Sequence, residues 1–195
     1  MERVMIFIDG NNFYHAAKNY LNQSPKYKLE ELCQNVTNKK PNRYLLRSYF
    51  YTVNEPHQQA IINALKKIPR ISVNAEGYLK KNRIPGITFD PNDPSTYISE
   101  EKRTDINLTT DLLVGAYMNS YDTAIIFSAD NDYLTPIKEI QKIGKIVELV
   151  ITEGQPISEN LRNTVDEVFE LNEDDFKNCW NGTYISNRRQ AQTTP

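Results

Sequence analysis

The sequence predicts an α/β domain built on a mostly parallel sheet. Two apolar runs, VMIFID (4–9) and TAIIFSA (123–129), lack the alternation of polar and apolar residues, as is typical of strands buried on both faces. Amphipathic segments of ten or more residues separate several such runs. Strands that alternate with helices of this length indicate βαβ units and therefore a parallel sheet.

The elements follow in order along the chain. We expect a sheet of five or six strands, at 4–9, 44–51, within 70–80, at 123–129, 145–152 and 167–171. The helical patterns fall at 55–68, 105–120 and 132–144, the last one closed by a glycine. The segment 84–103 holds three prolines and a glycine, which predicts a long irregular loop or small insertion. We expect one domain over residues 1–172 and a polar, flexible tail over 173–195.

Composition narrows the class of protein. The chain has 195 residues, 39% hydrophobic residues and a net charge of −2, which is typical of a globular domain and lacks the basic excess of many nucleic-acid-binding domains. The two cysteines form no C-x-x-C pair and no zinc spacing with the two histidines. No apolar stretch approaches the roughly 18 residues that cross a bilayer. We therefore expect a cytoplasmic protein with reduced cysteines that does not enter membranes.

Four aspartates fall where a parallel sheet binds ligands. Asp9 ends the first strand, Asp130 and Asp132 follow the fourth, and Asp105 begins the helix that leads into the fourth. Ligands of such sheets bind beyond the carboxyl ends of the strands, so these acids are expected to converge at one edge. Each aspartate taken alone has a simpler alternative role as a helix N-cap. Four coincident caps are less plausible than a shared site. Clustered carboxylates repel one another unless a cation or a proton neutralises them, and an all-oxygen ligand set suits Mg²⁺ or Mn²⁺.

The chemistry of such a site is phosphoryl transfer. Hard divalent ions held by carboxylates activate water and screen a scissile phosphate. The P-loop pattern G-x-x-x-x-G-K and the nucleophile elbow G-x-S-x-G are both absent from the sequence.

Four segments together resemble the NYN (LabA-like) family of the PIN-like nuclease superfamily. They are FIDGNNFY, EKRTDINLTTDLL, IIFSADNDYLTPIKEIQKIGKIVELV and ISENLRNTVDEVFEL, and the resemblance as a whole runs from residue 4 to residue 171. The specificity lies in order and spacing: D-x-x-N at the first strand, K-x-x-D before a helix, and S-x-D-x-D-[FY] after a strand. The family often has Gly at Ala129, Asn131 and Arg103, and Phe at Tyr133, so this chain departs from the pattern at those positions.

The resemblance implies a Rossmann-like, three-layer PIN-like fold that cleaves RNA with a divalent metal. Asp9, Asp105, Asp130 and Asp132 match the family's acidic, metal-binding residues. Asn12 matches the Asn of D-x-x-N and could orient a metal-bound water or a phosphate; its alternative role is a hydrogen bond to backbone. Ser128 matches the small hydroxyl residue before the fourth-strand acids, in a supporting role.

Other residues are weighed against their ordinary roles. Asp111 lies about 240° around the helix from Asp105, so we expect a polar anchor more than a catalytic acid. The basic residues that flank the long loop are expected to line the entry path of a single-stranded RNA. Their positive charges would bind the phosphate backbone, and an adjacent aromatic ring would stack on a base. They are Lys80, Lys81, Arg83, Lys102 and Arg103. A merely solvated basic run is the alternative.

Three functions compete at this point. A metal-dependent endoribonuclease that acts on RNA is the leading hypothesis, because all four acids are present. A non-catalytic scaffold of the same fold, which binds RNA or protein, is the second. A haloacid-type phosphatase would show D-x-D-x-[TV] at the first strand, where this chain reads DGNNF. The sequence leaves the oligomeric state open and allows a homodimer.

Overall fold

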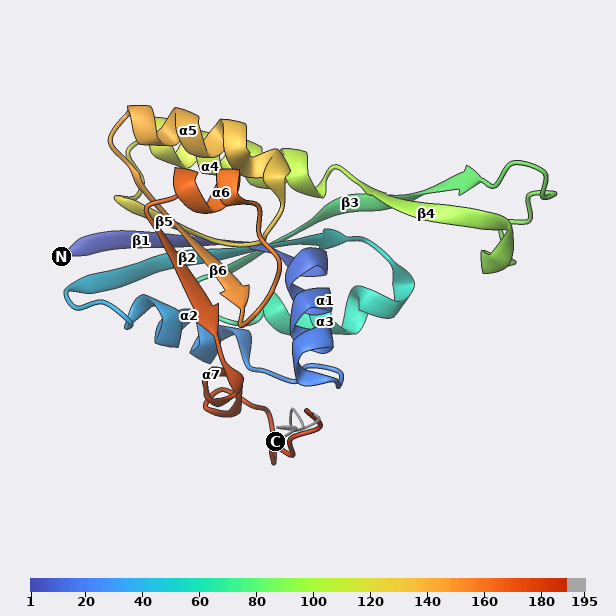
Figure 1. Ribbon diagram of the computed structural model, residues 1–195, viewed down its shortest axis with the longest axis horizontal. Helices are drawn as coiled ribbons and strands as arrows, with labels where there is room; N and C mark the ends of the chain where they lie inside the picture. The colour runs from blue at the N-terminus through green and yellow to red at the C-terminus, as the bar shows by residue number, and fades with distance from the viewer. Residues whose placement is uncertain (189–195) are drawn as a thin grey trace, which may run out of the picture.

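The computed structural model describes residues 1–188 and contains one seven-stranded sheet. Its strand order is β4-β3-β2-β1-β5-β6-β7 (Figure 1). All neighbouring strands are parallel except the antiparallel β3–β4 pair. The strands are β1 (Glu2–Asp9), β2 (Arg43–Val53), β3 (Ile71–Arg83), β4 (Tyr97–Lys102), β5 (Thr123–Phe127), β6 (Ile146–Thr152) and β7 (Glu167–Leu171).

Helices cover both faces of the sheet and produce three layers. α1, α2 and α3 lie on one face, and α4, α5 and α6 lie on the other (Figure 1). The helices are α1 (Gly10–Leu21), α2 (Leu29–Thr37), α3 (Gln59–Leu65), α4 (Thr104–Tyr117), α5 (Leu134–Lys142), α6 (Glu159–Thr164) and α7 (Glu173–Lys177). Short 3-10 turns are η1 (Pro56–Gln58), η2 (Pro94–Thr96) and η3 (Asn131–Tyr133). Within residues 1–188, none of these helices has both the length and the apolar character needed to cross a bilayer.

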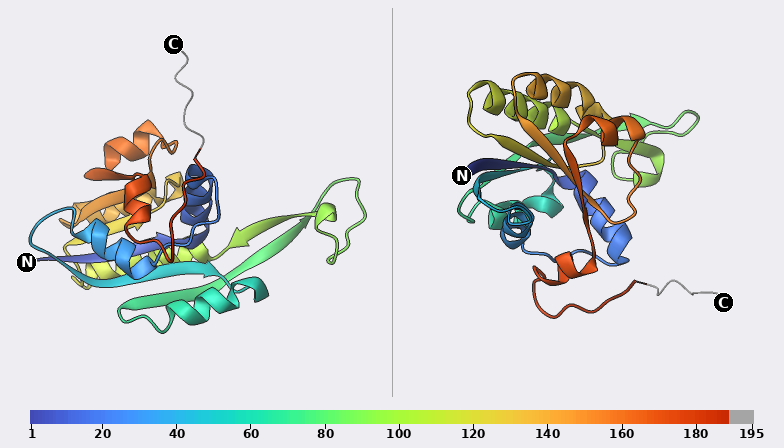
Figure 2. Two further views of the ribbon diagram at one scale, coloured as in Figure 1. Left: turned by 90° about the horizontal axis from the view of Figure 1, so that it is seen from below. Right: turned by 60° about the vertical axis from the view of Figure 1, so that its left-hand side comes forward.

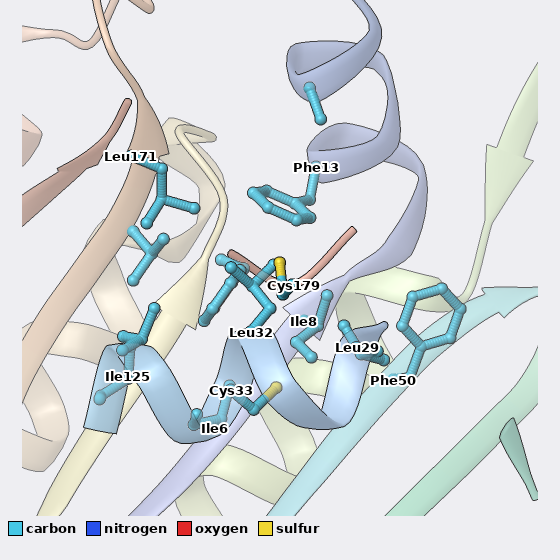
Figure 3. Close-up of a cluster of buried hydrophobic side chains, with 14 of the residues drawn as sticks. Ile6, Ile8, Phe13, Leu29, Leu32, Cys33, Phe50, Ile125, Leu171 and Cys179 are labelled. Carbon is cyan, nitrogen blue, oxygen red and sulfur yellow. The ribbon is translucent and has the colours of Figure 1, made fainter. Parts of the chain in front are cut away.

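Each face of the sheet has its own hydrophobic core. Under α1 and α2, Phe13 and Leu32 pack with apolar side chains of the central strands (Figure 3). On the opposite face, Leu108 of α4 and Ile137 of α5 pack against the other side of the same strands. The central strand β5 is buried at every position, which explains why its sequence is uniformly apolar.

The expected count of five or six strands is wrong, because β4 forms inside the segment 84–103. This segment is not wholly irregular, since β4 pairs with the outer half of β3 from Tyr78 to Arg83. The pair projects beyond the rest of the sheet as a two-stranded arm (Figures 1 and 2), and we use "the arm" for residues 78–102. The sequence YISEEK of β4 follows three prolines and is mostly polar, so its residues did not predict a strand.

The segment expected to be a flexible tail begins with α7 and packs against the core. Phe176, Cys179 and Trp180 are buried in the cluster under α1 and α2. The apolar side chains of these residues are spaced too irregularly for a sequence pattern to reveal them. The part of the expected tail from residue 189 to 195 lies outside the described residues, and the boundary at residue 172 stays a prediction.

Candidate active site

The four predicted aspartates lie at the carboxyl edge of the sheet, around its topological switch point. From β1, the chain builds β2, β3 and β4 on one side and then returns to build β5, β6 and β7 on the other. The strand order therefore reverses between β1 and β5, and Asp9 ends β1 while Asp130 follows β5. In open α/β sheets, ligands bind in the crevice at this point.

Asp9 is a buried carboxylate held by two hydrogen bonds. It caps α1, with Oδ1 accepting from the backbone amide of Asn12 at 3.0 Å, and Oδ2 accepts from the Tyr133 hydroxyl at 3.2 Å. Asp9 is only 6% exposed to solvent. Burial raises the pKa of Asp9 to about 6, and the negative charges of Asp105 and Glu101 act in the same direction.

Gly10 explains how α1 begins so close to the sheet. A Cβ at this position would lie 2.6 Å from the carbonyl oxygen of Tyr51 and 2.6 Å from Cζ of Phe50. Backbone and a buried ring cannot yield at that distance. The glycine of DGNN therefore allows Asp9 to be both the last residue of β1 and the cap of α1.

Tyr133 joins the acids of two segments. Its hydroxyl lies 3.2 Å from Asp9 Oδ2 and 3.0 Å from Asp105 Oδ1, and its ring is 1% exposed. One hydroxyl carries one proton, so it donates fully to one carboxylate at a time. Protonated Asp9 can donate to the tyrosine oxygen while the tyrosine donates to Asp105. Burial raises the pKa of Asp105 as well, and the charges of Asp130 and Asp132 add to that rise.

Asp130 and Asp132 come from the loop after β5. The backbone amide of Asp130 donates to Ser128 Oγ at 3.2 Å, and Asp130 Oδ1 accepts from the amide of Asp132 at 3.0 Å. Asp130 therefore caps η3, which agrees with the capping role weighed from the sequence. Asp130 is partly buried and Asp132 is exposed, whereas Ser128 is buried beneath them.

Asn12 serves the backbone of the neighbouring loop. Its side-chain Oδ1 accepts from the amide of Ala129 at 3.4 Å, which ties the start of α1 to the loop after β5. This contact matches the backbone-bonding alternative for Asn12. The oxygen is thereby occupied, and the amide nitrogen remains as a donor.

A fifth carboxylate, which the sequence analysis missed, adjoins the cluster. Glu101 of β4 accepts hydrogen bonds from the Thr104 hydroxyl and the Asn11 side chain. Burial raises the pKa of Glu101, and the charge of Asp105 adds to the rise. The pairing of Leu79 with Glu101 brings this residue to the site, so recognising β4 would have been the signal.

Asp111 lies apart from the cluster, as expected of a polar anchor. Its Oδ2 accepts from the buried Tyr51 hydroxyl at 2.9 Å. The bond fastens α4 to β2, and Asp111 contributes to the position of α4.

The five predicted basic residues divide between the two faces of the arm and its base. Residues paired across an antiparallel ladder share a face, so Lys81 and Arg83 lie on the face of Glu101. Lys80 lies on the opposite face with Lys102, whose Nζ is paired with a carboxylate of Glu100.

Aromatic rings accompany the cations at the arm. Lys81 Nζ lies 4.7 Å from the Tyr97 ring centroid and donates to the carbonyl of Pro91 at 2.7 Å. The Arg83 guanidinium lies 5.5 Å from the Phe89 ring. At the base of the arm, Arg103 has a φ of 77° and lies 5.3 Å from the Tyr78 ring. Glycine adopts a left-handed backbone without steric cost, which explains why the NYN family often has glycine at this position.

The donor set fits a hard divalent ion in chemistry, since every candidate ligand is a carboxylate oxygen. In the arrangement described for residues 1–188, however, no three Asp, Glu, His or Cys side chains are grouped closely enough to hold a metal ion. Tyr133 occupies the space between Asp9 and Asp105. Binding an ion therefore requires the carboxylates to draw together, and the exposed side chains of Asp105 and Asp132 are placed to do so.

Three comparisons with known proteins give matches for this chain. The model of the NYN domain family matches residues 3–172. The protein "Low amplitude and bright protein LabA" of Synechococcus elongatus is 28% identical over 174 residues, which cover 88% of this chain and 84% of that protein. A crystal structure of a protein of unknown function from Vibrio parahaemolyticus superposes with a TM-score of 0.62 at 18% identity, covering 89% of this chain and 94% of that one. This structural likeness shows the fold.

Proposed function

Because the chain belongs to the NYN domain family, a PIN-like family of nuclease type, we propose that it is a divalent-metal-dependent ribonuclease. It hydrolyses RNA phosphodiester bonds as an endonuclease at the aspartates beyond β1 and β5. The observation that carries the proposal is the convergence of Asp9, Asp105 and the Asp130–Asp132 pair at the switch point, with the pKa values of Asp9 and Asp105 raised. Structural ion pairs would instead lower the pKa of a carboxylate.

Mg²⁺ or Mn²⁺ would be held by Asp9, Asp105, Asp130 and Asp132. When bound, such an ion lowers the pKa of a water molecule and offsets the charge of a scissile phosphate. Tyr133 orients Asp9 and Asp105 through its shared hydroxyl.

The loop that carries the last two acids is kept in place by its neighbours. Ser128 and Asn12 support it through bonds to the amides of Asp130 and Ala129, respectively. The side chains of both residues therefore act on the backbone from which the acids project.

One face of the arm supplies two of the cations that a protein of net charge −2 needs to hold a polyanion. Lys81 and Arg83 share the face of Glu101 and lie beside Tyr97 and Phe89, an arrangement that suits a single strand. Lys102 lies close enough for its charge to act on Asp105, and Lys80 and Arg103 would add to the attraction. Single-stranded RNA is the proposed partner, and a cytoplasmic location remains a prediction.

A non-catalytic scaffold that binds RNA or protein is the second candidate. It is favoured by Tyr133, because a hydroxyl that lies between the two carboxylates links Asp9 to Asp105 without a metal. The two functions differ in what happens to bound RNA.

The deciding experiment incubates the purified chain with labelled single-stranded RNA, structured RNA and DNA, each with Mg²⁺, Mn²⁺ or EDTA. Cleavage of single-stranded RNA that requires the metal supports the ribonuclease. RNA that is bound but left intact under every condition supports the scaffold and contradicts the ribonuclease.

A further inference from the structure

A polar cleft of about 520 Å³ opens beside the acid cluster, between α1 and the loop after β6. One wall is the exposed side of α1, and the other is the loop 152–156. The main polar lining residues are Asn11, Asn12, His15, Asn19, Glu153 and Gln155. The volume falls within the range of roughly 300–1,000 Å³ that is common for small-molecule sites.

The cleft is continuous with the proposed active site. The side chain of Asn11 contacts Glu101, and Asn12 holds the loop that leads to Asp130. His15, which lines the cleft, also lies near Glu101. A group bound in the cleft would therefore lie directly next to a phosphate at the aspartates.

The lining offers uncharged donors. The side-chain oxygen of Asn12 is occupied by the amide of Ala129, and that of Gln155 accepts from the amide of Thr152 at 3.0 Å. Both side chains therefore retain amide N–H donors. In the described part of the chain, no lysine or arginine lines this cleft, and Arg188, outside the lining, is already bonded to Tyr20 and lies near Glu153.

Glu153 supplies the acceptor. Its Oε2 accepts from the Tyr20 hydroxyl at 2.7 Å and lies 3.6 Å from Arg188 Nη1. Both contacts use the same oxygen, and among residues 1–188 no side chain donates to Oε1. A carboxylate oxygen of this kind suits the hydroxyl of a ribose, and the 2′-hydroxyl is the group that distinguishes RNA from DNA.

We propose that this cleft binds the ribose and base of the nucleotide next to the scissile phosphate, with Glu153 accepting from the 2′-hydroxyl. The inference rests on the proposed ribonuclease function. It adds which part of the RNA the protein recognises, namely the nucleoside beside the phosphate that is cleaved. Asn12 and Gln155 would donate to acceptor atoms on the base edge through their side-chain amide N–H groups.

The test uses a variant that fills the cleft without touching an acid. Ala16 lines the cleft on α1, and Ala16→Phe would occupy it. Ala60→Phe, at an exposed position of α3, is the matched control. The full chain is titrated in EDTA against a fluorescein-labelled single-stranded RNA oligonucleotide, with binding followed by anisotropy. We expect Ala16→Phe to weaken binding at least about tenfold and Ala60→Phe to leave it unchanged.

A second variant tests the sugar and guards against misfolding of the first. Glu153→Ala is compared with Glu159→Ala, which removes the same charge from an exposed position of α6. We expect only Glu153→Ala to reduce the ratio of RNA affinity to DNA affinity, by about tenfold, for one hydrogen bond to a charged group. Normal RNA binding by Ala16→Phe, together with an unchanged ratio of RNA to DNA affinity in Glu153→Ala, overturns the proposed nucleoside site. This result leaves the proposed ribonuclease function untouched. If the unaltered chain binds no RNA, the proposed function and this inference both fail.

Discussion

Asp9→Asn tests whether the carboxylates are held in an unfavourable arrangement when no metal is bound. Burial raises the pKa of Asp9 from 3.8 to about 6. At 1.36 kcal/mol per unit, ionising Asp9 in the folded protein at neutral pH costs about 3 kcal/mol relative to the unfolded chain. Asparagine removes that cost and is as good an N-cap as aspartate, although its bond to the Asn12 amide is weaker by about 1 kcal/mol.

The variant is therefore expected to be about 2 kcal/mol more stable than the unaltered protein at pH 7.5 in EDTA. For a chain of this length, that corresponds to a rise in Tm of roughly 4–8 °C. The gain depends on pH in a defined direction. Because the folded-state pKa is raised, the unfolded chain releases its proton first, and stability falls as pH rises from about 4 to 6. Below that window, both states are protonated and the gain disappears.

Circular dichroism melts of both proteins between pH 4 and 8 measure this effect. Asp122→Asn is the control with the opposite sign, because the bond from Arg3 lowers the pKa of Asp122 to about 2. Its carboxylate stabilises the fold above pH 3.8 and loses that effect as pH falls toward 2, so Asp122→Asn lowers Tm at pH 7.5. A Tm for Asp9→Asn at or below that of the unaltered protein at pH 7.5 would show that ionised Asp9 does not destabilise the metal-free fold.

Three further predictions concern the arm, Glu101 and Tyr133. Changing Lys81 and Arg83 to Ala should reduce the slope of log affinity against log salt concentration for single-stranded RNA, by ~0.7 per lost contact. Lys80→Ala, on the opposite face of the arm, should reduce this slope less. Equal slopes for the two variants in a filter-binding assay would mean that RNA does not distinguish the two faces of the arm. Glu101→Gln should raise Tm in EDTA at pH 7.5, since burial raises the pKa of Glu101, and a fall in Tm would contradict this. Tyr133→Phe should lower Tm in EDTA by the equivalent of about 1–2 kcal/mol through the lost hydroxyl and still permit metal-dependent cleavage; loss of cleavage with the fold intact would make the hydroxyl itself essential.

The sequence predicted the central strands and the edge at which the acids meet, because both follow from local patterns. Buried parallel strands are uniformly apolar, and the aspartates fall directly after β1 and β5. The arm was not predicted, since β4 is held by pairing with β3 over a long connection and carries polar residues on both faces.

The finer parts of the site depend on contacts between distant segments. Tyr133 was noted as a departure from the family's phenylalanine, but its place between Asp9 and Asp105 is set by how α4 and η3 pack. Glu101 joins the cluster through a strand that local patterns did not reveal. Lys80 and Lys81 lie on opposite faces of the arm because side chains alternate along a strand. The expected strand ended at residue 80, so this alternation was not predicted for the residues beyond it.

Asp130→Asn asks whether the aspartates beyond β1 and β5 carry out RNA cleavage. Asparagine keeps the size of the side chain and its ability to cap η3, so the variant should fold and melt normally. Asp174→Asn, at an exposed position of α7, removes the same charge away from the site and serves as the control. With labelled single-stranded RNA and Mn²⁺, we expect the unaltered protein and the control to cleave, and Asp130→Asn to cleave no more than the EDTA blank. Cleavage by folded Asp130→Asn at the rate of the unaltered protein would show that Asp130 takes no part in the reaction and that the proposed site is wrong.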